Sequence, residues 1–149
     1  MEIGYLWLAL SLFLFLMTTG AAIVLAAVAF PLVRQADEKR FPETFRLFRR
    51  RKTWSCSFLA LLSFAFCILL TLYPPYGFPD RMMGWMAVVF GLLAVTTISA
   101  QVASRKLNRD GRDARILGRL GVLLWVSVLD WLVGNVLLVN AHIIVVGLL

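Results

Sequence analysis

The fold class is decided by residues 120–149, LGVLLWVSVLDWLVGNVLLVNAHIIVVGLL. This run is apolar almost throughout, and it is longer than the ~20 residues that a helix needs to cross the ~30 Å hydrocarbon core of a bilayer. It also contains a carboxylate, Asp130, which is costly to place in hydrocarbon unless something there stabilises it. The run therefore predicts a membrane-spanning helix with a polar group near its middle.

Three further apolar runs precede this one. Together the four runs predict an all-α integral membrane protein, a bundle of four transmembrane helices that forms a single domain over residues 1–149. Hydrophobic residues make up 61% of the chain and charged residues 15%, against roughly 25% charged residues in soluble domains. We expect the helices at about 3–33, 54–73, 82–103 and 120–149.

The basic residues are distributed very unevenly along the chain. Of the fifteen Lys and Arg residues, fourteen lie in residues 34–52 and 105–119, and the other is Arg81. By the positive-inside rule both long polar loops face the cytoplasm, so both termini lie outside. The net charge of +7 then reflects topology rather than nucleic-acid binding. We expect the chain in a bacterial inner (plasma) membrane, with an organellar inner membrane as the alternative.

The first polar loop contains a short basic amphipathic segment. Phe41, Phe45 and Phe48 recur at spacings of four and three, which is typical of one face of a helix. We expect this helix to lie at the membrane surface, where each basic residue contributes about 1 kcal/mol of attraction to anionic lipid. The candidate lipid contacts are Arg46, Arg49, Arg50, Arg51 and Lys52. The alternative is an ordinary cytoplasmic loop whose charge serves topology alone.

Asp130 lies about 15 Å along the helix from Leu120, near the middle of the bilayer. Three interpretations compete: a neutral carboxyl bonded to a hydroxyl, a carboxylate paired with a cation of another subunit, and a proton or ion site in a transport path. The polar groups assigned to this intramembrane site are Asp130, Asn135, Ser127, Thr18, Thr19 and Ser63. Because Thr18, Thr19 and Asn135 match in depth, we expect the first and fourth helices to be neighbours.

Small residues recur at helical spacing and predict close helix packing. The packing candidates are Ala22, Ala26, Gly84, Gly91 and Gly134. The first and fourth runs are also longer than a bilayer requires, and the excess falls on the outer side. An apolar overhang of this kind indicates a protein contact. The expected partners are membrane lipids and other membrane protein subunits, contacted through the outer ends of the first and fourth helices.

The chemistry of the remaining residues is sparse. His142 is the single histidine, so no multi-histidine metal site is expected, although a lone histidine near the outer interface is a candidate ligand for haem or chlorophyll. The alternative is a histidine that is only hydrogen-bonded. We find no CxxC, HExxH, GxSxG or glycine-rich phosphate loop. No catalytic residue and no metal ligand is assigned.

These observations favour a small non-catalytic subunit or accessory protein of a larger membrane complex, which acts through transmembrane helix packing. The alternative is a small proton- or ion-coupled carrier with Asp130 at its centre. A weaker alternative is a membrane enzyme that acts on a lipophilic substrate.

Overall fold

The computed structural model describes residues 3–52 and 56–147, which form helices joined by short turns and include no strand. Three segments are long and apolar enough to cross a membrane: Ile3–Gln35, Asp80–Asp110 and Ala114–Gly147. A shorter apolar helix, α4, covers Phe58–Leu72. The all-helical prediction is confirmed for these residues, and the apolar helices are compatible with an integral membrane protein. The predicted helix start at Trp54 and helix end at Leu149 lie outside the described residues.

The first rod of the bundle contains α1 (Ile3–Val24), a π-helical turn η1 (Leu25–Ala29) and α2 (Phe30–Gln35). The predicted end at residue 33 is therefore two residues too early, and Pro31 does not end the helix. Proline has no N–H to donate, and its ring collides with the carbonyl four residues before it. The wider π turn accommodates this mismatch, and the Phe30 N–H donates to the Leu25 carbonyl, five residues back.

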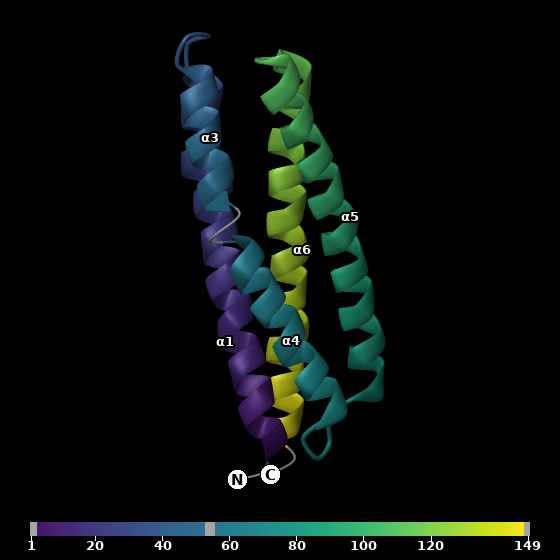
Figure 1. Cartoon of the computed structure of the whole chain (residues 1–149). Coiled ribbons are helices and arrows are strands. Elements are labelled where there is room, and N and C mark those ends of the chain that lie inside the picture. The colour runs from purple at the N-terminus through teal and green to yellow at the C-terminus, as the bar shows by residue number, and fades with distance from the viewer. Residues whose placement is uncertain (1–2, 53–55, 148–149) are drawn as a thin grey trace.

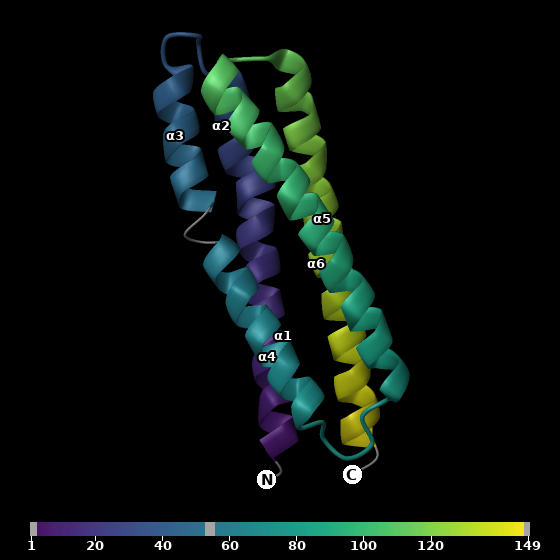
Figure 2. The same cartoon turned by 45° about the vertical axis from the view of Figure 1, so that its right-hand side comes forward.

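The predicted amphipathic helix is confirmed as α3 (Phe41–Lys52). Its orientation differs from the expectation, because α3 runs along α2 and η1, nearly in line with α4, instead of lying across the end of the bundle (Figures 1 and 2). The physical reason is aromatic packing. All three phenylalanines of α3 are buried, and the Phe48 ring lies 6.0 Å from that of Phe30 on the first rod.

Helices α5 (Asp80–Asp110) and α6 (Ala114–Gly147) are longer than the predicted 82–103 and 120–149 at the end where they are connected. Most of the expected polar loop 105–119 is therefore helical, and only residues 111–113 form a turn. Gly111 has φ of 84° at the end of α5, a conformation that favours glycine. Asp113 then caps α6, because its Oδ1 accepts from the backbone N–H of Arg115 at 2.8 Å. Leu107 and Leu117, which stand among charged residues in the sequence, are buried in the hydrophobic core.

The main helix contacts are α5 with α6, α1 with α4 and α1 with α6. The prediction that the first and fourth expected helices are neighbours is thus confirmed. Phe15 occupies the centre of the core, with its ring 4.8 Å from that of Trp131 and 5.6 Å from that of Phe90. Gly134 permits this packing, because a Cβ there would collide with the Phe15 ring.

The ends of α1 and α6 at which the sequence predicted an apolar overhang have neighbours within this chain. The segments that contain α1, α5 and α6 have 33, 31 and 34 residues, so these three rods are almost equal in length. At the end where α1 begins, Gly4 lies so close to the Pro-rich turn that a Cβ there would be 2.5 Å from the Pro75 nitrogen. Leu8 and Val145 are fully buried. These ends of α1 and α6 thus pack partly against the rest of the chain, while Ile3 and Ile143 stay exposed, and the expected protein contact there stays a prediction.

Candidate functional site

Asp130 lies on α6 at the contact with α5, where its side chain is half-buried. Its Oδ2 accepts from the Thr96 hydroxyl at 3.5 Å, the long limit for a hydrogen bond. The same hydroxyl lies 3.0 Å from the Leu92 carbonyl, and a hydroxyl has only one proton to donate. Asp130 therefore has one weak partner within the described residues.

Sequence reasoning did not assign Thr96 to the site, because a threonine within a helix usually bonds to its own backbone. The sequence feature that could have identified Thr96 is the short turn at 111–113. In an antiparallel pair of helices, residues at similar distances from the turn lie at similar heights. Thr96 and Asp130 stand sixteen and eighteen residues from Arg112, so recognising the turn would have predicted this pair.

Asn135 connects α6 to α1 in the core. Its Nδ2 donates to the Thr19 hydroxyl oxygen at 2.6 Å and to the Trp131 carbonyl at 3.0 Å. The Thr19 hydroxyl in turn donates to the Phe15 carbonyl at 2.7 Å. The Asn135 Oδ1 is buried and has no hydrogen-bond partner among the described residues. The asparagine is thus held firmly through its nitrogen.

Thr18 and Ser63 form a third polar contact, between α1 and α4. Their hydroxyl oxygens are 3.2 Å apart, and both side chains are fully buried. Each hydroxyl is also within bonding distance of a carbonyl of its own helix, Leu14 for Thr18 and Leu59 for Ser63. Four of the residues assigned to one intramembrane site therefore form two separate pairs, whereas Asp130 bonds to Thr96 and to neither Ser63 nor Thr19.

Ser127, the remaining member of that set, lines a small cavity of about 70 Å³ together with Lys52, Cys56 and Trp131. Lys52 is half-buried there, whereas the four arginines of the proposed lipid contact are exposed. Burial lowers the pKa of the Lys52 ammonium, and the nearby Cys56 opposes that shift. The structure thus separates Lys52 from Arg46, Arg49, Arg50 and Arg51.

The expected cofactor ligand and packing residues are placed as follows. His142 is exposed on α6, and in the described part of the chain no cluster of three His, Cys, Asp or Glu side chains is arranged to hold a metal ion. Haem or chlorophyll at His142 stays a prediction.

Of the expected packing residues, Ala22 and Ala26 are buried. Gly84 and Gly91 face outward, and no atom outside their own helix turns lies within 4 Å of a Cβ built on either.

Comparisons of the chain with protein-family models, with curated proteins and with solved structures give no significant match.

Proposed function

We propose that the chain is a small non-catalytic subunit or accessory protein of a larger membrane protein complex, and that it acts through helix packing. The observation that carries this proposal is the outward-facing pair Gly84 and Gly91 on α5. They lie seven residues apart, about two turns, and therefore share one side of the helix. Small residues let two helix backbones approach closely in a membrane. Since no helix of the described chain covers this side, it is available to a helix of another protein.

The polar groups of the core support this proposal over transport. Thr18–Ser63, Thr19–Asn135 and Thr96–Asp130 are three separate contacts, each between a different pair of helices. Isolated pairs of this kind stabilise helix packing, whereas an ion path needs groups that follow one another across the bilayer. The carrier alternative depends on Asp130 alone, whose one hydrogen bond is the weak contact with Thr96.

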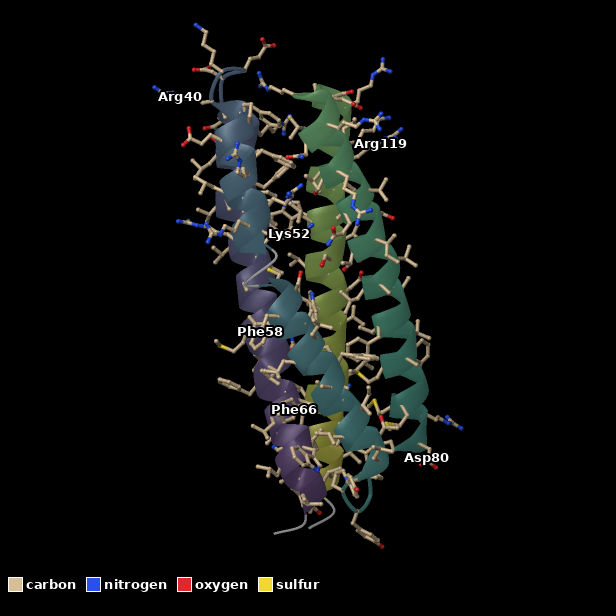
Figure 3. The ribbon with its side chains drawn as sticks, viewed as in Figure 1. Arg40, Lys52, Phe58, Phe66, Asp80 and Arg119 are labelled. Atoms are coloured by element: carbon tan, nitrogen blue, oxygen red, sulfur yellow. The ribbon has the colours of Figure 1, made fainter. Side chains whose placement is uncertain are left out.

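The proposal also includes four membrane crossings with both termini outside, in a bacterial inner membrane or an organellar inner membrane. Its support is the distribution of charge along the bundle. Charged side chains gather at the end that carries Arg40 and Arg119, whereas Asp80 and Arg81 lie at the other end (Figure 3). Lys39→Cys and Tyr76→Cys, each made with Cys56 and Cys67 replaced, test the orientation with an impermeant thiol reagent on intact cells. We expect labelling at 76 alone; labelling at 39 alone would reverse the orientation.

The subunit function is tested by purifying the tagged chain from its native membrane in mild detergent. We expect a membrane protein to co-purify in fixed ratio with the parent chain and to be lost from the double variant Gly84→Leu/Gly91→Leu. A Cβ added at either position meets no atom of another described helix within 4 Å, so folding should be unchanged. Gly20→Leu is the matched control, because Gly20 also faces outward with open space around it. A chain that purifies alone, or a double variant that keeps its partner, would contradict the proposal.

A further inference from the structure

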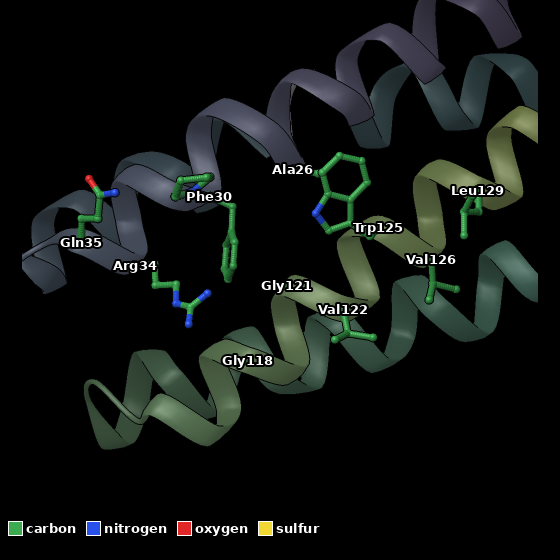
Figure 4. A pocket seen from close by; sticks show the side chains of 11 residues that line it. Ala26, Phe30, Arg34, Gln35, Gly118, Gly121, Val122, Trp125, Val126 and Leu129 are labelled. Atoms are coloured by element: carbon green, nitrogen blue, oxygen red, sulfur yellow. The ribbon is translucent and has the colours of Figure 1, made fainter.

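A groove of about 700 Å³ runs between the η1–α2 segment and α6 (Figure 4). Its volume lies within the ~300–1,000 Å³ range of small-molecule sites. On the α6 side Gly118 and Gly121 contribute no side chain, so the groove is open there. A Cβ on Gly118 would meet no atom within 4 Å, whereas one on Gly121 would be 2.7 Å from the Phe30 ring. Glycine at 121 therefore permits the close approach of the Phe30 ring, and Gly118 leaves free space beside the groove.

The walls of the groove are mainly apolar and open sideways. Val122, Trp125 and Leu129 line it from α6, and each is at least half exposed. Figure 4 shows the Trp125 ring extending from α6 toward Ala26 on the opposite wall. In a chain whose helices lie in a bilayer, a lateral apolar groove is in contact with lipid chains, so an alkyl chain is the occupant that matches these walls.

One end of the groove is cationic. Arg34 lines it, and its guanidinium points from α2 toward α6 (Figure 4). The Arg112 Nη2 donates to the Arg34 carbonyl at 3.2 Å, which brings a second guanidinium to the same end. Within residues 3–52 and 56–147 neither arginine forms an ion pair. This end therefore presents two unneutralised cations at the border of an apolar surface.

We propose that this groove binds an anionic phospholipid, with the phosphate on Arg34 and one acyl chain along Val122, Trp125 and Leu129. A planar guanidinium can form two parallel hydrogen bonds with a phosphate, and these are stronger than bonds between neutral groups. Arg40 and Arg119 lie toward the end of the bundle that carries the α5–α6 turn, whereas Lys52 at the end of α3 lies farther toward the middle (Figure 3). Basic residues at one end of a membrane bundle attract anionic lipid. The site is independent of Gly84 and Gly91 on α5, so it does not rest on the partner proposed above.

The test is native mass spectrometry of the purified chain in micelles that contain equal amounts of phosphatidylglycerol and phosphatidylcholine. We expect the parent chain to retain mainly phosphatidylglycerol. Arg34→Met should reduce the retained phosphatidylglycerol about tenfold, because a hydrogen bond to a charged group is lost. Gly118→Leu should reduce it as well by filling the groove, and Arg34→Lys should keep part of it. Excess inorganic phosphate should not displace the lipid.

The matched controls are Arg81→Met, which removes an exposed arginine in the first turn of α5, and Gly20→Leu, which adds a leucine to an exposed site on α1. Both should retain phosphatidylglycerol as the parent chain does. Circular dichroism should show equal helix content in all variants, and the comparison of the two lipids on the parent chain applies whether or not a variant folds. Equal retention of the two lipids, displacement by phosphate alone, or an unchanged Gly118→Leu variant would each overturn the proposal.

Discussion

Asn135 and Asp130 lie five residues apart on α6, yet their surroundings differ sharply. Asn135 is buried in the contact between α1 and α6, with a 2.6 Å hydrogen bond to Thr19, whereas Asp130 is half-buried beside α5 with a 3.5 Å bond to Thr96. Their positions differ by about 7.5 Å along the helix and by about 140° around it. The difference shows that the angle around the helix, more than depth, decides whether a polar residue in an apolar run becomes part of the core.

The largest effect on stability is expected at Asn135, the buried residue of this pair. Asn135→Ala removes the bond to Thr19 and leaves a small cavity between α1 and α6, so we expect the free energy of unfolding to fall by about 2 kcal/mol. The measurement is reversible unfolding in mixed micelles. Asn140→Ala is the control, because Asn140 is exposed on the same helix. Equal stability of the two variants would show that Asn135 is not a core contact.

A smaller effect is expected for the hydrogen bond alone. A double-mutant cycle of Thr19→Val and Asn135→Ala should give a coupling free energy of about 1 kcal/mol, within the range measured between membrane helices. Thr18→Val belongs to a different pair, with Ser63, and should show little coupling to Asn135→Ala. Strong coupling of Thr18 to Asn135 would contradict the separation of the polar pairs.

The smallest effect on stability is expected at Asp130. Asp130→Asn keeps a donor and an acceptor for Thr96, so the free energy of unfolding should change by no more than about 0.5 kcal/mol. The co-purifying partner should also be retained. Loss of the partner would mean that Asp130 neutralises a cation of another subunit. Unchanged assembly with loss of transport, partly restored by Asp130→Glu, would favour the carrier alternative.

The two polar segments differ in how well the sequence predicted them. In the first polar segment, residues 34–52, the helix was expected from Phe41, Phe45 and Phe48, because their spacing already indicates a buried face. In the second, charged residues surround Leu107 and Leu117 so closely that the apolar period of α5 and α6 is hidden, and the helices were predicted too short. Charge at the end of a bundle thus obscures helical periodicity without ending the helix.

The sequence by itself determined the class of the protein, the approximate positions of its apolar helices and the concentration of basic residues at two segments. These properties follow from hydropathy and spacing, which are local along the chain. Only the tertiary structure decided that Asp130 faces Thr96, that α3 stands beside α2, and that a groove opens at Gly118. The physical reason is that the rotation and pairing of helices depend on many distant side chains at once, as where the Phe15 ring packs against Gly134.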